Sequence, residues 1–508
     1  MRRITRLSSC SALALGLAAG PAFAELTAHQ VWTGIESAMQ GFGYSVTATE
    51  TPNADGLDVT DVVMRFEAPE DDAVVEFAIE SIDLVENSDG SVSMTFPVSM
   101  PITIDAAPED QEDVMMVLDY DNEGLEIVVS GEPGDMTYTY TADRLSISLE
   151  EMEIDGEAIG REEARFDFSI EDVSGATVAR TTEGTNLTQD VTALSASYDF
   201  AFNDPDSDDA ALVTGSMADL FVSSATVLPE GFDPNDPQAL ANGGFSASGS
   251  MGYTNGEMQF AATESAGTTS GTTQTDTVQL EFDIDDAALR YDVAATGQAV
   301  TLSGPELPLP VDVRLAESAF RITMPIAKAD QPQDMAFGLT LRGFEMSDLL
   351  WNVFDPGAAL PRDPATIAFD LTGQVTPFIN LFDPAQMARV EATNQPPGEL
   401  NALTLNNLTI EAAGAKLGGS GAFTFDNDDM QTFDGFPRPT GEVNVTIDGA
   451  NALIDKLIAM GLLTNEDAMG ARMMISMFAV PGDGPDSLKS SLTINDQGHV
   501  LANGMRIQ

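Results

Sequence analysis

Hydrophobic and polar residues alternate with a period of two along most of this chain. One example is the run Val75, Glu76 and Phe77, and the pattern resumes after a turn at residues 87–90. Because successive side chains of a strand point to opposite faces, this alternation predicts hairpins with one apolar and one solvated face. It continues to the end of the chain, so we predict a mainly β fold built from long, curved antiparallel sheet.

Two irregularities interrupt the alternation. The apolar positions change phase across Glu150 and Glu151, which predicts a β-bulge. Asn255 is followed by Gly256, a pair typical of two-residue hairpin turns, so we predict a tight turn there.

A four-residue period predicts a few helices. At the N-terminal end, Thr27 and Gln30 form a capping box before Val31, and the helix is expected to end at Gly41. Ser347 can cap a short helix over residues 348–354. A pair of helices is expected near the C-terminus, over residues 453–461 and from Asn465 through the methionines that follow.

Two segments suggest an internal duplication. Residues 217–221 resemble residues 346–350, and a Phe-Asp-Pro tripeptide follows each, at 232–234 and 354–356. A third copy of the tripeptide, at 382–384, is ordinary turn chemistry. The predicted organisation is a signal peptide (1–24), an N-terminal helix with a β-meander (25–160), a first β-rich repeat (161–295) and a second repeat with the C-terminal helices (296–508).

The first residues have the layout of a secretory signal peptide. Arg2, Arg3 and Arg6 precede an apolar stretch at residues 12–19, and small residues precede the expected cut between Ala24 and Glu25. We therefore expect a periplasmic or secreted protein. The single cysteine lies in this leader, which excludes disulfides and thiolate metal sites from the remainder.

The chain carries 82 acidic and 21 basic residues, a formal net charge of −61. A charge of this size repels nucleic acid phosphates and anionic lipid headgroups, so no nucleic acid partner is expected. The acids are spread along the whole chain, which favours a solvated surface in a salty, well-screened medium. No stretch after the leader is apolar enough to predict a transmembrane span.

Catalytic and metal-binding signals are weak. The only histidines are His29 and His499, and neither neighbours a nucleophile-elbow sequence, so we predict no enzyme activity and no cofactor. Asp204, Asp206 and Asp208 resemble the start of a calcium loop. Asp209 stands where that loop needs glycine, so a solvated acidic loop is the favoured interpretation.

Methionines and large apolar residues are the candidates for an apolar ligand. Methionine side chains adapt to irregular apolar shapes. The alternative is that the two predicted C-terminal helices cap the sheet and that their methionines fill gaps in its core. The candidate residues are Trp351, Leu453, Leu457, Met469, Met473 and Met477.

Several blocks together resemble one family. They are Val31-Trp32 with the leader before it, residues 346–364, residues 441–478 and residues 502–506. The chain resembles the domain-of-unknown-function 2125 family (DUF2125) of exported alphaproteobacterial proteins, a resemblance that implies no activity and no catalytic residues.

More distantly, the glycine-punctuated strands around residues 413–421 resemble AsmA-type envelope proteins. That resemblance implies long curved sheets with an apolar inner face and a role in lipid traffic or outer-membrane assembly. This chain departs from them in its acidity and in lacking an N-terminal membrane anchor.

We therefore expect an exported, non-enzymatic, β-rich protein that binds or moves a lipid or another apolar ligand in the cell envelope. The first alternative is a structural or protein-interaction scaffold in the periplasm, with an envelope protein as its partner. A hydrolase is the least favoured alternative.

Overall fold

The computed structural model describes residues 26–68, 73–106, 113–181, 184–205, 207–232, 239–241, 243–393 and 395–508. The predicted signal peptide, with Ala24 and Glu25 at its cut, lies outside the described residues, as does Asp206.

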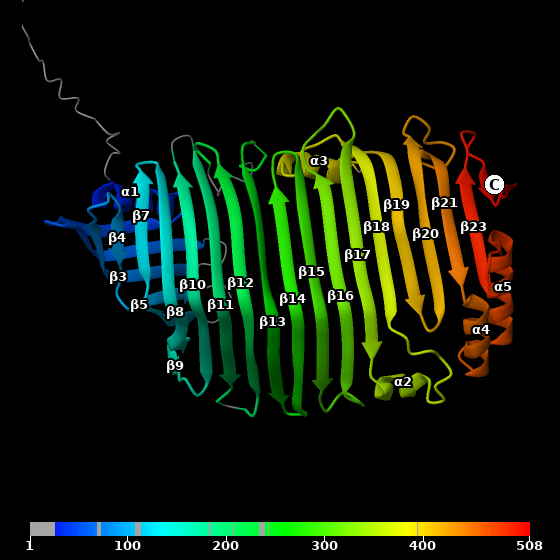
Figure 1. Ribbon diagram of the computed structural model, residues 1–508, viewed down its shortest axis with the longest axis horizontal. Helices are drawn as coiled ribbons and strands as arrows, with labels where there is room; N and C mark the ends of the chain where they lie inside the picture. The colour runs from blue at the N-terminus through cyan, green and yellow to red at the C-terminus, as the bar shows by residue number, and fades with distance from the viewer. Residues whose placement is uncertain are drawn as a thin grey trace, which may run out of the picture.

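In the described part of the chain, 25 strands form one antiparallel sheet (Figure 1). Its N-terminal strands are β1 (Ser45–Pro52), β2 (Gly56–Ala68), β3 (Ala73–Glu86), β4 (Val92–Thr95), β5 (Ser99–Ala106), β6 (Val114–Glu123), β7 (Glu126–Glu132), β8 (Asp135–Ile154) and β9 (Glu157–Ile159). The long central strands are β10 (Ala164–Arg180), β11 (Thr185–Asn203), β12 (Ala210–Leu228), β13 (Ser246–Glu264), β14 (Gly267–Ile284), β15 (Ala288–Ser303), β16 (Val311–Pro325), β17 (Gln333–Met346) and β18 (Ala365–Pro377). The C-terminal strands are β19 (Gly398–Ala412), β20 (Ala415–Asp426), β21 (Arg438–Asp448), β22 (Val480–Pro481), β23 (Ser487–Ile494), β24 (Val500–Ala502) and β25 (Met505–Arg506).

The strands follow one another as a meander. β4 and β5 lie end to end along β3, and β6 and β7 lie end to end along β8. From β10 onward each long strand pairs with the one before it and the one after it, as far as β21 and β23. The mainly β, antiparallel fold predicted from the alternation is confirmed.

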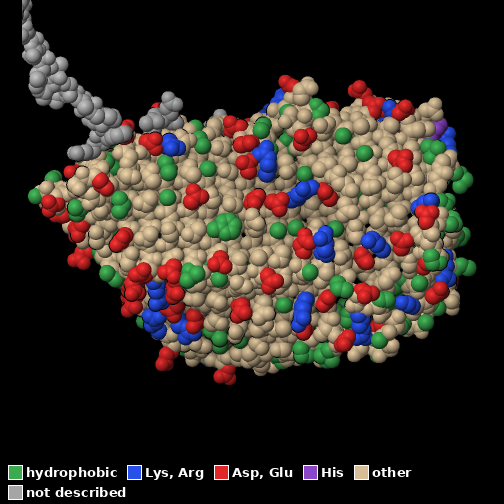
Figure 2. Space-filling model, in the orientation of Figure 1, with side chains coloured by type: hydrophobic (Ala, Val, Ile, Leu, Met, Phe, Trp, Pro, Cys, Tyr) green, Lys and Arg blue, Asp and Glu red, His purple; other side chains and the backbone are tan. Residues whose placement is uncertain are grey.

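The cross-strand register gives the sheet two chemically different faces. In the interior of strands β10–β21 and β23, every Asp, Glu, Lys and Arg falls on one face, which we call the polar face. Figure 2 shows acidic and basic side chains scattered over one broad side of the molecule. The opposite face, the apolar face, carries Val, Leu, Ile, Met, Phe and Tyr together with small or uncharged residues.

A line of bulges crosses the sheet near the middle of the strands, and we call it the crease. At the crease a strand places two consecutive residues on the polar face, and the extra residue often has a positive φ, as at Asp172 (50°), Asp219 (49°), Gly297 (62°) and Gly343 (70°). Neighbouring strands shift together, so most pairs stay in register across it. A separate bulge at Glu150, opposite Val117 and Leu118, confirms the predicted change of phase.

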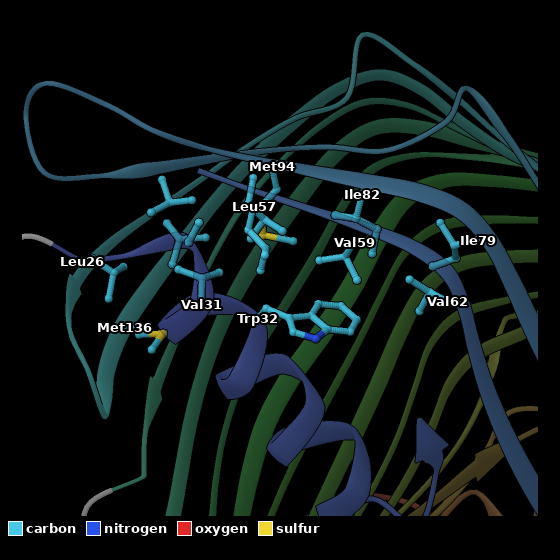
Figure 3. Packing of buried hydrophobic residues seen from close by; sticks show 14 residues of the cluster. Leu26, Val31, Trp32, Leu57, Val59, Val62, Ile79, Ile82, Met94 and Met136 are labelled. Atoms are coloured by element: carbon cyan, nitrogen blue, oxygen red, sulfur yellow. The ribbon is translucent and has the colours of Figure 1, made fainter. Parts of the chain in front are cut away.

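Helix α1 (Ala28–Gly41) packs against the first strands and closes the best-buried core. The capping box is confirmed: the Gln30 amide donates to Thr27 Oγ1 (3.3 Å), and the Thr27 amide donates to Gln30 Oε1 (3.0 Å). Val31 and Trp32 are fully buried. Figure 3 shows them beside Val59 and other apolar side chains of the strands that curve around the helix.

Four further helices lie at the ends of strands or beside the last strands (Figure 1). They are α2 (Asp348–Phe354), α3 (Pro384–Thr393), α4 (Ala450–Ala459) and α5 (Asn465–Phe478). The predicted helices at α2, α4 and α5 are confirmed, with Thr464 rather than Asn465 as the N-cap of α5. Helix α3 was not predicted. Its signal was Asp383 followed by proline, a start in which the carboxylate accepts from the amides of Ala385 and Gln386.

Two local predictions are wrong. Asn255 and Gly256 lie inside β13, where Asn255 takes a positive φ of 50° at the crease, so they form a bulge instead of a hairpin turn. Residues 217–221 lie inside β12 between two strand partners, whereas the similar residues 346–350 end β17 and begin α2. The likeness therefore does not mark a repeated helix. The predicted boundary after residue 160 falls between β9 and β10, and the one after 295 falls within β15.

Candidate apolar ligand surface

The central part of the apolar face is not covered by any described element. In strands β12–β21 no Val, Leu, Ile, Met, Phe or Tyr side chain is fully buried. Val222, Met251, Ile367 and Ile410 of this face remain 38–46% exposed. A sheet face of this composition is normally buried against a second layer. Here no described element provides that second layer.

Aromatic rings form a row in the middle of this face. Tyr291, Phe320, Phe337 and Phe369 come from four consecutive strands, β15 to β18, and their ring centroids are 6.3, 5.6 and 6.0 Å apart. Such tilted and edge-on contacts hold the rings in place and leave one side of the row accessible. The row is therefore a rigid, uncharged platform.

Two hollows deepen the apolar face. One, of about 420 Å³, lies beside the aromatic row and is lined by Ile322, Phe337, Val375 and Leu400 among others. The second, of about 350 Å³, lies nearer the N-terminal end and is lined by Phe77, Ile102, Tyr120, Ile127 and Leu145 among others. Both fall within the size of typical small-molecule sites.

The electrostatics of the second hollow favour an uncharged occupant. Burial raises the pKa of the Tyr120 phenol, so this group stays neutral. Tyr138, close to the α1 core, has its pKa raised for the same reason. The only polar groups these rings offer are neutral hydroxyls.

The polar face also has hollows, and some of the charged side chains around them pair with one another. The larger, of about 1050 Å³, is lined by Asp121, Arg144, Asp167, Asp199, Glu257 and others. Within it Asp199 pairs with Arg165 (2.7 Å) and Asp167 pairs with Arg161 (3.0 Å). Exposed pairs of this kind contribute little each and mark a solvated surface.

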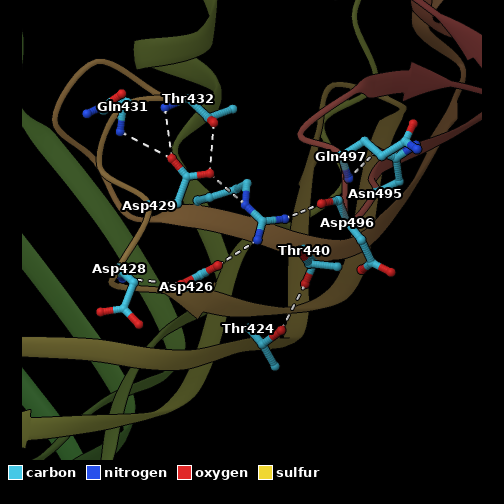
Figure 4. Close-up of polar contacts among 11 residues, drawn as sticks. Thr424, Asp426, Asp428, Asp429, Gln431, Thr432, Thr440, Asn495, Asp496 and Gln497 are labelled. Atoms are coloured by element: carbon cyan, nitrogen blue, oxygen red, sulfur yellow. Dashed lines mark hydrogen bonds and ion pairs between the residues drawn. The ribbon is translucent and has the colours of Figure 1, made fainter.

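At the C-terminal end, a partly buried guanidinium connects a loop to a turn (Figure 4). Arg438 is 18% exposed and contacts Asp426 (2.6 Å), Asp429 (2.9 Å) and the backbone carbonyl of Asp496. The cluster joins the loop between β20 and β21 to the turn between β23 and β24. Every group in it has a partner, so it is a structural cluster.

Of the predicted ligand residues, those on α2 and α4 are partly buried. The Trp351 ring lies under the guanidinium of Arg362, with 5.8 Å from its centroid to Cζ, and packs against Phe354 at 5.1 Å. Leu453 and Leu457 are partly buried on α4.

Met469, Met473 and Met477 are 69%, 62% and 55% exposed on α5. They point to solvent, away from the aromatic row. The structure therefore does not bring the six predicted residues together into one site.

The predicted calcium and histidine positions are also separate from the apolar face. Asp204 accepts a hydrogen bond from Ser207 (3.0 Å), and Asp208 is exposed; no group of metal ligands forms among the described residues. His29, on α1, contacts Glu50 through Nδ1 (2.9 Å). His499 lies in the turn before β24, at the other end of the sheet, where its amide donates to Asn495.

The aromatic row was missed from the sequence. Each ring occupies an ordinary apolar position of an alternating strand. The alternation predicts which face of the sheet the ring lies on, but not which side chains of the adjacent strands lie next to it. The register that places the rings in adjacent strands depends on the crease, which alternation alone does not reveal.

Comparisons with known proteins place part of the chain in one family. A family model described as "Uncharacterized protein conserved in bacteria (DUF2125)" matches residues 230–507. No curated protein and no solved structure matches the chain. Among the described helices, none combines the length and apolarity that a membrane crossing requires.

Proposed function

The chain belongs to DUF2125, a family of bacterial proteins without an assigned activity, and we therefore propose its function from the geometry: it binds the acyl chains of a lipid on its apolar face. The observation that carries the proposal is the uncovered, uncharged face of β12–β21 with its aromatic row. Leaving so much apolar surface in water is unfavourable, by about 25 cal/mol for each Å².

The shape of the face favours extended chains over a compact ligand. Strands in a sheet lie about 4.8 Å apart, so the twelve successive pairings from β10 to β23 present a face roughly 60 Å wide. The face holds no convergent set of polar groups that would orient a small polar molecule. Several acyl chains lying along the face would cover it, and their headgroups would remain in water at its rim.

A second copy of the chain is a poorer cover for this face. Two chains that each carry a net charge of −61 repel one another, whereas a lipid adds little charge. The resemblance to AsmA-type envelope proteins, which implies lipid traffic, supports the same choice.

We further propose that the protein acts outside the cytoplasm and without catalysis. The basic, apolar and small-residue layout of residues 1–24 supports export with a cut between Ala24 and Glu25. The two histidines lie at opposite ends of the sheet, away from the apolar hollows, which supports a binding role.

Native mass spectrometry of protein purified from the periplasm, without detergent, tests both parts. The expected species is a chain that begins at Glu25 and carries additional lipid mass. Phe337→Glu places a charge in the aromatic row and should abolish the lipid-bound species. Thr340→Glu is the matched control, because it adds the same charge on the polar face of the same strand, outside the hollow, and should leave lipid binding intact. A wild-type chain without lipid that also takes up none from excess phospholipid would refute the binding role.

A further inference from the structure

Helix α5 presents its largest apolar side chains to solvent. Leu462, Met469, Met473, Met474, Met477 and Phe478 form what we call the α5 patch, and the four methionines are 55–69% exposed. Met469, Met473 and Met477 recur every four residues along one face, and Met474 and Phe478 form the adjacent row. The inward side of the helix is formed by Ala468, which is only 1% exposed, and by the partly buried Ala471, Arg472 and Ile475. This is the reverse of an ordinary surface helix, which buries its large apolar side chains.

The charges around the patch differ from those of the rest of the chain. From residue 468 to residue 482 the only charged side chain is Arg472, and it pairs with Asp455 of α4 (2.6 Å); Glu466 and Asp467 lie just before this stretch, in the first turn of α5. Two further cations lie nearby: Lys489 pairs across strands with Val480, the residue that follows α5 by two positions, and Arg506 follows the exposed Met505. In Figure 2 this edge of the molecule shows hydrophobic side chains together with basic and some acidic ones.

We propose that the α5 patch docks the C-terminal end of the sheet on a phospholipid bilayer. Exposed apolar side chains flanked by Lys and Arg are what the boundary between headgroups and acyl chains accepts. The acidic polar face is repelled by anionic headgroups, whereas none of the six side chains of the patch is acidic.

A protein partner fits the patch less well. A stable interface uses roughly twenty or more residues on each side, and the patch offers six. A second copy would in addition bring two strongly acidic chains together. The proposal stands apart from lipid binding on the apolar face, because it rests on α5 and not on the aromatic row.

Flotation with vesicles tests the docking. Wild-type protein is expected to float with phosphatidylcholine vesicles. It should float with vesicles of equal parts phosphatidylcholine and phosphatidylglycerol only at high salt, which screens the repulsion. The triple variant Met469→Gln, Met473→Gln and Met477→Gln should partition at least about ten-fold less, because three side chains no longer leave water.

The matched control removes three apolar side chains that are exposed elsewhere. Val98→Gln, Leu194→Gln and Leu212→Gln change side chains that are 69%, 55% and 38% exposed and should leave flotation unchanged. Met473→Trp should bind more tightly than wild type and give a blue-shifted tryptophan emission with vesicles, a readout that is independent of the triple variant's folding. Phe337→Glu should still float, which separates docking from the proposed lipid binding.

Three results would overturn the proposal. The first is wild-type protein that does not float with phosphatidylcholine vesicles at any salt concentration. The second is a folded triple variant that floats like wild type. The third is a wild-type dimer in analytical ultracentrifugation that the triple variant converts to monomer, which would make the patch an interface between copies.

Discussion

At the residue scale, the carboxylate of Asp429 fixes the start of the loop that joins β20 and β21. It accepts from the Thr432 hydroxyl (2.8 Å), from the Thr432 amide (3.1 Å) and from the Gln431 amide (3.2 Å), and it pairs with Arg438. These contacts, the Thr432 hydroxyl foremost, lower the pKa of Asp429 below its ordinary value. The charged form is therefore the one that holds the loop.

Asp429→Asn should loosen this loop at neutral pH. A lowered pKa stabilises the folded state above the ordinary carboxyl pKa of about 4, and that stabilisation is lost as pH falls through the folded-state pKa. We expect the Gln431 and Thr432 amides to exchange roughly ten-fold faster in the variant at pH 7, with the difference vanishing in strong acid. Hydrogen exchange read by mass spectrometry measures this.

Asp428→Asn is the control, because the Asp428 carboxylate points away from the cluster in Figure 4. Equal protection in all three proteins at neutral pH would show that Asp429 does not hold the loop.

Asn255 shows what a residue's chemistry can and cannot predict. Asn followed by Gly favours a positive φ, and Asn255 has one. A positive φ serves a hairpin turn and a mid-strand bulge equally well. What distinguishes a bulge from a turn here is that the preceding residue, Thr254, pairs with strands on both sides, with Ala218 and with Thr277. Both partners lie more than twenty residues away in the chain.

At the element scale, the crease explains how strands of up to 20 residues stay apolar on one face. Each bulge adds one residue and would turn every later side chain to the wrong face, unless the sequence changes phase with it. Leu220 and Val222 continue the apolar face of β12 after Asp219 because their phase has changed. At each bulge of the crease, the alternation of apolar and polar residues in the sequence therefore changes phase by one residue.

Gly343→Ala tests the crease. Gly343 has a φ of 70°, and an added Cβ would lie 2.7 Å from the Cβ of Ala316 in the neighbouring strand. The left-handed backbone and the contact together should lower the free energy of unfolding by about 1–3 kcal/mol. Urea denaturation measures the change.

Asn255→Gly serves as the control at another position of the crease, because glycine accepts the same positive φ and should change stability little. An alanine at 343 without effect on the urea midpoint would contradict the role assigned to the crease.

Helix prediction succeeded where the signal was local. The α1 capping box and the four-residue spacing in α5 are contained within a few residues, and both helices formed where expected. The direction in which the α5 methionines point was not predictable from their spacing. It depends on α4, where Asp455 pairs with Arg472 (2.6 Å) and so turns the opposite face of α5 outward.

At the scale of the whole molecule, alternation predicted two faces but not which would be covered. Covering a face requires a second layer, and the sequence between the strands supplies only short helices at their ends. Trp32 is buried because α1 lies over the first strands, whereas Phe337 is only partly buried because no described element reaches it. The candidate site, the apolar face of β12–β21, is therefore defined by the absence of a covering layer among the described residues, which the sequence pattern alone does not predict.

The charge of −61 predicts an unusual response to salt. Even if all 21 basic residues formed ion pairs, most of the 82 acids of the chain would remain unpaired. Those in the interior of β10–β21 share the polar face, where neighbouring strands lie about 4.8 Å apart. Repulsion among them is screened over about 10 Å at 0.1 M salt and about 3 Å at 1 M. We expect the melting temperature to rise by several degrees between low salt and about 1 M NaCl, and KCl should act alike. Most of the rise in melting temperature should occur at low salt concentration, because the screening of charge repulsion saturates. If exclusion of salt from the protein surface were the cause, the melting temperature would instead rise in proportion to the salt concentration. A melting temperature that falls with salt would instead mean that attractive pairs such as Arg321–Asp370 dominate the polar face.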